Sequence, residues 1–263
     1  MNKILKRLSL RELTNMLSNI ALINDRMKEI EDLRFQASKL EFILGGHLQG
    51  KNLWKKDSIG FNGQRKRKET FTAISALYDF DCILETGTNL GATTGYLAAV
   101  TGKKIYSCEI QPERYSMAYE ILIPYFNNIE LFNLNSIDFL KKIMPTLSKQ
   151  VPFIYLDAHW YQFLPLRDEI QIISSNCDQY LILIDDFQVQ GDKGYGYDKY
   201  GSGKSLTFKF IHDLVLKFGL TGYLPSVPSQ EETGARRGYV YLAKGESLVD
   251  KLSQVKLLKQ IER

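Results

Sequence analysis

The chain has 263 residues, with 34 Lys and Arg against 30 Asp and Glu, which gives a formal net charge of +4. Hydrophobic residues make up 44% and charged residues 24%, the composition of a folded globular protein, so we do not expect intrinsic disorder. No run approaches the ~18 consecutive apolar residues of a membrane span. The net charge is too small to indicate nucleic-acid binding, and the basic start lacks the apolar block of a secretory signal.

Three cysteines, Cys82, Cys108 and Cys177, lie among apolar residues. An odd number of cysteines in such surroundings disfavours a disulfide framework and favours a reducing compartment. We therefore expect a cytoplasmic protein without disulfide bonds.

The first predicted element is a helix over residues 8–42, which contain no Gly or Pro. Its apolar residues follow one another at steps of three and four, which is a heptad spacing. Such a seam either packs on the chain's own domain or joins two copies in a homodimer through residues 13–30. A third interpretation, a membrane-surface helix, is disfavoured by the acidic residues further along. The seam residues are Leu13, Met16, Ile20, Ile23, Met27 and Ile30.

A glycine-bearing loop over residues 45–64 is expected next, because the helix should end at Gly45 and Gly46. The basic run 65–68 follows this loop. Its simplest interpretation is the solvated start of a helix, and the alternative is an electrostatic clamp for an acidic substrate. Residues 1–64 are thus predicted to form an N-terminal helical extension and loop.

From residue 69 the chain alternates short apolar runs with helical stretches. This alternation predicts a mostly parallel sheet with helices on both faces, and two closing strands without a helix between them predict an antiparallel edge pair. We expect an α/β, Rossmann-like domain with a seven-stranded sheet over residues 65–246 and a C-terminal helix over 247–263. The predicted strands cover residues 82–84, 104–108, 129–134, 151–156, 180–184, 221–224 and 239–242. The predicted helices cover residues 69–78, 91–100, 112–126, 136–147, 163–175 and 204–218.

The first strand runs into a glycine-bearing turn, Glu85-Thr86-Gly87-Thr88-Asn89-Leu90-Gly91. Glycines at a strand-to-helix turn let a ligand approach the backbone, and the start of the following helix attracts polar or anionic groups. The second strand is followed by Glu109, a carboxylate that can accept hydrogen bonds from a ribose diol. The turn and the carboxylate together indicate a cofactor that carries adenosine.

Two cofactor classes share this design. Dinucleotide enzymes use G-x-G-x-x-G to seat a pyrophosphate, whereas this turn has Gly87 and Gly91 and is preceded by the acidic Glu85. A carboxylate facing a pyrophosphate is repulsive, but it suits a cofactor with a cationic amino-acid end, such as S-adenosylmethionine. A methyl donor is therefore favoured, and an NAD(P)-dependent oxidoreductase is the alternative.

Carboxylates follow two later strands: Asp157 comes after residues 153–156, and Asp185 and Asp186 come after residues 181–184. In an open parallel sheet, ligands bind beyond the carboxyl ends of the strands. Three carboxylates at one edge repel one another unless a cation offsets their charge. We therefore expect Asp157, Asp185 and Asp186 to bind Mg²⁺ or another hard divalent cation. The alternative is that Asp185 and Asp186 cap a loop or a helix.

His159 lies two residues after Asp157. A neutral histidine can take a proton from a hydroxyl near neutral pH, so Asp157 and His159 are the candidate catalytic residues. The alternative role of His159 is to orient the cofactor or to pack beneath a loop. His47 and His212 have no such context and are expected to be structural or surface residues.

Residues 190–203 form a segment rich in Gly and Tyr, and residues 201–205 read Gly-Ser-Gly-Lys-Ser. This is not a phosphate-binding P-loop, because Asp198 stands where that motif requires Gly and no apolar strand precedes it. The tyrosines can close over a substrate, so we expect a mobile lid.

Residues 69–243 resemble class I S-adenosylmethionine-dependent methyltransferases. The turn 85–91 is similar to the first motif of that family, and Glu109 matches its ribose-binding acidic position. Asn135 and Ser136 are similar to the segment that flanks the adenine. The resemblance therefore implies that these residues bind S-adenosylmethionine.

The resemblance extends to metal-dependent O-methyltransferases. Residues 156–161, which include Trp160 and Tyr161, are similar to a pattern in a bacterial subgroup of macrolide-sugar O-methyltransferases and cephalosporin-hydroxylase-like proteins, as are Asp168 and Glu169 downstream. Asp157 and residues 185–186 match the metal-binding positions of catechol O-methyltransferase-like enzymes. The resemblance implies Mg²⁺-dependent O-methylation. The lysine that is the base in catechol-type enzymes has no match here, so the base stays open.

These features predict an S-adenosylmethionine-dependent O-methyltransferase that acts on a sugar or glycan hydroxyl, with a phenolic or polyketide hydroxyl as second choice. An NAD(P)-dependent oxidoreductase and a non-catalytic cofactor-binding protein are the alternatives. The predicted cofactor-binding residues are Glu85, Thr86, Gly87, Thr88, Asn89, Gly91, Glu109, Asn135, Ser136 and Asp157.

Overall fold

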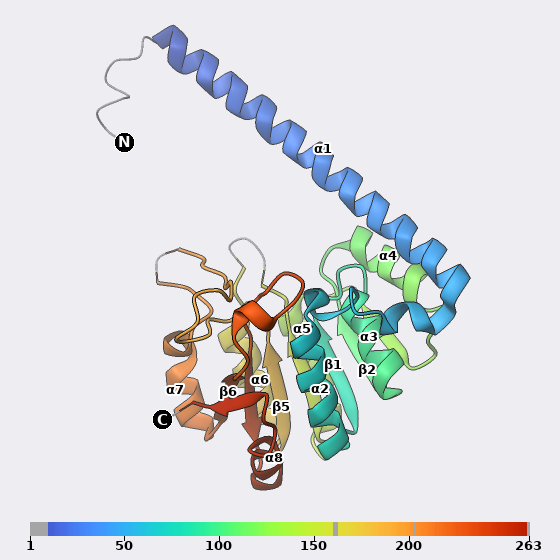
Figure 1. Ribbon diagram of the computed structural model, residues 1–263, viewed down its shortest axis with the longest axis vertical. Coiled ribbons are helices and arrows are strands. Elements are labelled where there is room, and N and C mark those ends of the chain that lie inside the picture. Colours follow the sequence, from blue (N-terminus) through green and yellow to red (C-terminus); the bar gives the residue numbers. More distant parts are fainter. Residues whose placement is uncertain (1–9, 160–162, 202, 262–263) are drawn as a thin grey trace. The chain divides into compact units, whose positions relative to one another are not determined.

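The computed structural model describes residues 10–159, 163–201 and 203–261 (Figure 1). The chain divides into two compact units, Met1–Leu48 and Gln49–Arg263. Among the described residues, no helix combines the length and the apolar character that crossing a membrane requires.

The first unit is built from the helix α1 (Leu10–Gln49), which continues past Gly45 and Gly46. A glycine in a helix interior lowers helix stability by about 1 kcal/mol, which does not by itself end the helix. A helix ends where a residue adopts the left-handed conformation. Gly50, with φ 53°, takes that conformation, and Gly45 and Gly46 do not. The described heptad residues are 45% to 59% exposed: Met16, Ile20, Ile23, Met27 and Ile30.

An eight-stranded sheet forms the centre of the second unit, in the order β3-β2-β1-β4-β5-β7-β6-β8. The first five strands in this order are parallel, β7 is antiparallel to β5 and β6, and β8 is antiparallel to β6. The mostly parallel sheet and its antiparallel edge are confirmed, with eight strands in place of the predicted seven. The strands are β1 (Cys82–Thr86), β2 (Lys104–Cys108), β3 (Ile129–Phe132), β4 (Pro152–Leu156), β5 (Tyr180–Ile184), β6 (Thr221–Pro225), β7 (Val240–Lys244) and β8 (Leu258–Gln260).

The eighth strand lies where the sequence predicts a C-terminal helix over 247–263. The helix is short, α8 (Glu246–Leu252), and the chain then returns to the sheet. β8 pairs with β6, with Gln260 opposite Tyr223, and so satisfies backbone groups along a sheet edge. Such pairing is a tertiary interaction, which the local pattern of a three-residue strand does not reveal.

Helices cover both faces of the sheet (Figure 1). On one face α5, α6 and α7 pack side by side, and on the other α2 packs with α8. These helices are α2 (Arg65–Leu77), α3 (Ala92–Thr101), α4 (Pro112–Leu122), α5 (Ser136–Ile143), α6 (Leu166–Asn176) and α7 (Phe208–Phe218). Short 3₁₀ helices cover Gly50–Lys55, Phe61–Gly63, Met144–Leu147 and Ser229–Glu231.

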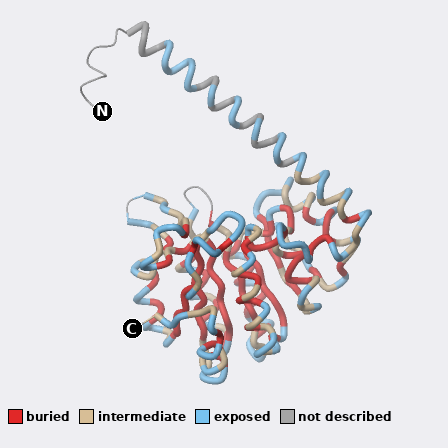
Figure 2. The backbone as a smooth tube through the Cα atoms, viewed as in Figure 1, coloured by how far each residue is buried: buried red, intermediate tan, exposed pale blue. Residues whose placement is uncertain are grey.

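Strands β1, β4 and β5 are the buried centre of the sheet, and every one of their residues is buried (Figure 2). Continuous apolar runs are typical of parallel strands that are covered on both faces. The strand register places Thr86 beside Cys108 and Leu156, and Leu156 beside Ile184. The polar residues that follow these positions therefore emerge along one edge of the sheet.

Candidate active site

The turn between β1 and α3 contains three residues in left-handed conformations: Gly87 (φ 90°), Asn89 (φ 50°) and Gly91 (φ 81°). A side chain at Gly87 would collide with the backbone of Asp157, which follows β4. A Cβ atom at Gly91, the N-cap of α3, would lie 2.5 Å from a methyl group of Leu122. The glycines therefore let this turn lie close to its neighbours and leave its backbone accessible to a ligand.

The Glu109 carboxylate follows β2 and is held by two backbone N–H groups. Oε2 accepts a hydrogen bond from the Asn89 N–H at 2.8 Å, and Oε1 accepts one from the Gln111 N–H at 2.9 Å. Each carboxylate oxygen retains further acceptor capacity. The oriented carboxylate can therefore accept hydrogen bonds from a vicinal diol such as that of ribose.

The segment after β3 brings Asn135 and Ser136 to the same edge of the sheet, at the start of α5. Asn135 is the N-cap of this helix, and its Oδ1 accepts a hydrogen bond from the Asp138 N–H at 2.9 Å. Ser136 is the first helical residue and is buried. The cap fixes where the helix begins, and so fixes the position of both residues.

One cleft at this edge brings most of the predicted site residues together. The apolar residues Ile110, Leu134 and Phe163 also line it, and so do Arg114 and Asp198, which no motif indicated. Arg114 lies in the first turn of α4 and Asp198 lies in the segment 190–203, so neither residue directly follows a strand. The predicted residues that line the cleft are Gly87, Asn89, Glu109, Asn135, Ser136, Asp157, His159 and Asp186.

The cleft lining does not include four of the predicted cofactor residues: Glu85, Thr86, Thr88 and Gly91. The Glu85 carboxylate is buried, and it accepts hydrogen bonds from the hydroxyls of Ser107, at 2.6 Å, and Thr94. Burial raises the pKa of Glu85 to about 7. Glu85 thus ties β1 to β2 and α3 and lies outside the lining of the cleft.

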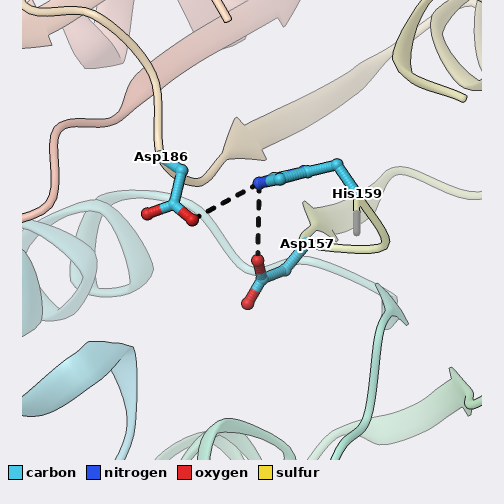
Figure 3. A group of neighbouring side chains, drawn as sticks. All are labelled: Asp157, His159 and Asp186. Atoms are coloured by element: carbon cyan, nitrogen blue, oxygen red, sulfur yellow. Dashed lines mark ion pairs between the residues drawn. The ribbon is translucent and has the colours of Figure 1, made fainter. Parts of the chain in front are cut away.

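Asp157, His159 and Asp186 converge in the cleft (Figure 3). His159 Nε2 lies 3.8 Å from Asp157 Oδ1 and 3.5 Å from Asp186 Oδ2. One ligand atom from each of the three residues lies within 4.8 Å of the other two. The structure therefore brings together two of the three predicted metal ligands, and joins to them the histidine that was expected to act in catalysis.

The third predicted metal ligand, Asp185, is part of a buried ion pair. Its Oδ1 accepts a hydrogen bond from Nη2 of Arg67 at 2.6 Å, and both side chains are fully buried. Its Oδ2 accepts hydrogen bonds from the Tyr155 hydroxyl and, at 3.2 Å, from Nδ2 of Asn62. An arginine from the basic run 65–68 therefore offsets charge that the sequence analysis assigned to a cation.

A second arginine, Arg237, joins Asp186 to the segment predicted as a lid. Its Nε donates to Oδ1 of Asp186, and its Nη2 donates to Oδ1 of Asp198. The Asp198 N–H also donates to the carbonyl of Asp186 at 3.0 Å. The ring of Tyr200 meets that of His159 edge-on, with centroids 6.2 Å apart. This part of the segment therefore contacts residues that follow β4 and β5.

The charges around His159 favour its protonated form. Burial disfavours the imidazolium, but Asp186 and Asp157 outweigh burial and raise the pKa of His159 to about 9. Burial and the nearby Asp185 hold the pKa of Asp157 well above its usual range. Burial also opposes the Asp186 carboxylate, but His159 and Arg237 outweigh it and lower the pKa of Asp186 to about 2. The two carboxylates therefore favour a positive charge at this position.

Comparison with solved structures finds this architecture in methyltransferases. An O-methyltransferase from Bacillus cereus in complex with S-adenosylhomocysteine has a TM-score of 0.52 and 17% identity, over 79% of this chain and 91% of that chain. A structure described as a caffeoyl-CoA O-methyltransferase from Staphylococcus aureus has a TM-score of 0.52 and 15% identity, over 80% and 100% of the two chains. The chain has the class I methyltransferase fold. No family model and no curated protein matches its sequence.

In this methyltransferase fold the cleft lies beyond the carboxyl ends of the parallel strands, where open α/β sheets bind ligands. The resemblance also rested on Trp160 and Tyr161, which lie outside the described residues. Asp168 and Glu169 belong to the first turn of α6, and Glu169 is buried there. Burial raises the pKa of the Glu169 carboxyl.

Proposed function

We propose that this protein transfers a methyl group from S-adenosylmethionine to a hydroxyl group of a small molecule. One observation carries the proposal: a single cleft is lined by the turn at Gly87, by Glu109 and by the start of α5, and also by Asp157 and His159. The first group suits an adenosine and the second suits a hydroxyl and its proton. The methyltransferase fold supports the same assignment.

The cofactor half of the cleft would hold S-adenosylmethionine through its ribose and its adenine. Glu109 would accept hydrogen bonds from the ribose hydroxyls. Apolar surface for the adenine ring would come from Ile110, Leu134 and Phe163. Gly87 allows the methionine end to approach the backbone. Carboxylates in the cleft favour a cofactor with a sulfonium over one with a diphosphate.

In the proposed reaction the acceptor oxygen attacks the methyl carbon in line with the leaving sulfur. The O–CH₃ bond forms as the S–CH₃ bond breaks, the sulfonium becomes a neutral thioether, and the hydroxyl proton passes to a base in the cleft, either Asp157 or His159. Most of the rate enhancement would come from holding the three reacting atoms in line. A divalent cation such as Mg²⁺, when bound, would lower the pKa of the acceptor hydroxyl.

We propose a sugar or glycan hydroxyl as the acceptor. The resemblance to macrolide-sugar O-methyltransferases points to this class. The side chains of Asp157, Asp186 and Asp198 on the cleft support it, because carboxylates accept hydrogen bonds from a polyol.

Isothermal titration calorimetry with S-adenosylhomocysteine and with NAD⁺ tests the cofactor. We expect S-adenosylhomocysteine to bind and NAD⁺ not to bind. The substitution Glu109→Gln should weaken S-adenosylhomocysteine binding about 10–100-fold, because hydrogen bonds to a charged group contribute about 1.5–3 kcal/mol. The matched control Glu130→Gln, at an exposed position of β3, should bind as the wild type does.

Two results would contradict the proposal. Binding of NAD⁺ without binding of S-adenosylhomocysteine would favour a nicotinamide-dependent oxidoreductase. Binding of S-adenosylhomocysteine without methyl transfer to any member of a panel of sugars, glycans and phenols would favour a non-catalytic cofactor-binding protein.

A further inference from the structure

We propose that Asp157, His159 and Asp186 bind a first-row transition-metal dication, and that the histidine makes this site prefer Mn²⁺ and Zn²⁺ to Mg²⁺. As a statement about catalysis this inference rests on the function proposed above. The binding itself is a property of three side chains, so it can be measured without cofactor or acceptor.

The distances between the three side chains fit a shared cation. Nε2 of His159 lies 3.5 Å from Oδ2 of Asp186 and 3.8 Å from Oδ1 of Asp157, as the dashed lines in Figure 3 mark. Ligands about 2.0–2.2 Å from a common metal lie about 3–4 Å apart. The two separations are too long for good hydrogen bonds and suit two edges of a coordination polyhedron.

The imidazole supplies an independent indication of a ligand. His159 is 7% exposed, and its Nε2 is a buried atom without a hydrogen-bond partner. A buried polar atom without a partner is costly, so it requires an explanation such as an ion that the atom would bind. In Figure 3 the imidazole points its Nε2 between the two carboxylates.

Each carboxylate has one oxygen near a neighbouring polar side chain and the other directed at His159. Arg237 Nε donates to Oδ1 of Asp186, which leaves Oδ2 facing the imidazole. The Tyr155 hydroxyl, which donates to Asp185, lies 3.2 Å from Oδ2 of Asp157, and Oδ1 of Asp157 is the oxygen nearest the imidazole. Outer hydrogen bonds of this kind orient the ligands of metal sites.

Asp185 is excluded from this ligand set because its oxygens are already engaged. Arg67 donates to Oδ1, and Tyr155 and Asn62 donate to Oδ2. Its side chain is fully buried and does not line the cleft. The three proposed ligands do line it, so a bound cation keeps open positions toward an acceptor oxygen.

The composition of the set decides the class of metal. Mg²⁺ prefers oxygen ligands in octahedral geometry and retains its water molecules, whereas imidazole suits Zn²⁺ and other transition metals. A set of two carboxylates and one imidazole therefore favours Mn²⁺ over Mg²⁺, and the general order of affinities places Zn²⁺ above Mn²⁺.

The experiment measures metal binding by the full chain after treatment with a chelator, without cofactor or acceptor. Mn²⁺ binding is followed by electron paramagnetic resonance, and Mg²⁺ and Zn²⁺ are added as competitors. We expect one Mn²⁺ per chain, displaced by equimolar Zn²⁺, and displaced by Mg²⁺ only at a concentration at least about tenfold higher. Displacement by equimolar Mg²⁺, or no bound Mn²⁺ at millimolar concentration, would overturn the inference.

Variants test the histidine directly. The substitution His159→Gln should weaken Mn²⁺ binding at least as much as the about 10–100-fold that loss of an outer-shell partner costs. His212→Gln, at an exposed position of α7, is the matched control and should bind Mn²⁺ as the wild type does. Circular dichroism establishes that both variants are folded, and the preference for Mn²⁺ in the wild type needs no variant. Unchanged Mn²⁺ affinity in folded His159→Gln would overturn the role of His159.

The outcome also separates this inference from the function on which it rests. Binding of S-adenosylhomocysteine with no bound Mn²⁺ would overturn the metal site and leave the methyltransferase proposal in place. Binding of Mn²⁺ without S-adenosylhomocysteine would support the metal site and contradict the methyltransferase.

Discussion

Glu85 is a buried carboxyl group whose pKa lies well above its usual range. It is 1% exposed and lies between the hydroxyls of Thr94 and Ser107. Burial raises its pKa from 4.5 to about 7, against the effect of those two hydrogen bonds. Glu85, which the sequence predicted to bind the cofactor, therefore bonds to β2 and α3 and does not line the cleft.

The pKa of Glu85 predicts a loss of stability as the pH rises. The unfolded chain releases this proton near pH 4.5, but the folded chain holds it to about pH 7. The stabilising contribution is therefore complete below pH 4.5 and is lost as the pH rises through 7. Glu85→Gln cannot ionise, so the free energy of unfolding of the wild type should fall relative to the variant by up to about 3 kcal/mol between pH 4.5 and 8.

Urea denaturation of wild type and variant across this pH range measures the difference. Glu130→Gln, at an exposed position of β3, serves as the control, and its difference from the wild type should show no such drift. Parallel curves for the wild type and Glu85→Gln would mean that the folded chain holds Glu85 ionised.

The helix α2 shows how a basic run divides between solvent and core. Arg65 lies on the exposed side, whereas Arg67 and Lys68 are 0% and 7% exposed. Glu232 accepts hydrogen bonds from the N–H groups of Lys66 and Arg67, at 2.9 Å and 3.0 Å, and so satisfies the start of the helix. The basic run is therefore not a wholly solvated helix start, because two of its four side chains, Arg67 and Lys68, are buried.

Removing Arg67 should destabilise the protein strongly, because the substitution Arg67→Met leaves Asp185 buried and unpaired. Breaking one partner of a buried ion pair costs about 3–5 kcal/mol. The neighbouring Arg65→Met is the control, because the pair of Arg65 with Glu69 is exposed and such pairs contribute about 0.2–1 kcal/mol.

Chemical denaturation of both single variants and of Arg67→Met with Asp185→Leu gives these free energies. The double variant should recover much of the loss, since replacing a buried pair by apolar side chains is often neutral. If Arg67→Met were no less stable than Arg65→Met, the ion pair would not stabilise the fold.

The first unit carries an apolar face that the described structure leaves exposed. Met16, Ile20, Ile23, Met27 and Ile30 are each between 45% and 59% exposed. A helix in a protein gains most of its stability from packing such a face against a neighbour, so we expect a partner for it. Self-association through residues 13–30 stays a prediction of the heptad spacing.

Sedimentation velocity tests this self-association. We expect the wild type to sediment as an oligomer, and the combined substitutions Ile23→Glu and Ile30→Glu to lower its mass to that of one chain, because charges in a heptad seam lose the apolar contacts. Gln36→Glu, an exposed position outside the seam, should keep the wild-type mass. An identical mass for the seam variant and the wild type would show that the seam is not the contact between copies.

Local patterns were sufficient for the fold class and for part of the site. Apolar runs alternating with helical stretches predicted the parallel sheet, and the glycine turn with Glu109 predicted one side of the cleft. These features follow from periodicity and turn chemistry over a few residues, which is why they can be read from the chain alone. The same patterns did not predict the eighth strand, which exists only because β8 pairs with β6.

The charge balance of the site was decided by tertiary structure. Arg67 lies 118 residues from Asp185 in the chain, and Arg237 lies 51 residues from Asp186. A carboxylate pairs with whichever cationic side chain the fold places beside it. A local sequence pattern does not predict which side chain that is when the two residues are far apart in the chain. The sequence therefore predicted one cation shared by Asp157, Asp185 and Asp186. The fold instead pairs Asp185 with Arg67 and places the imidazole of His159 between Asp157 and Asp186.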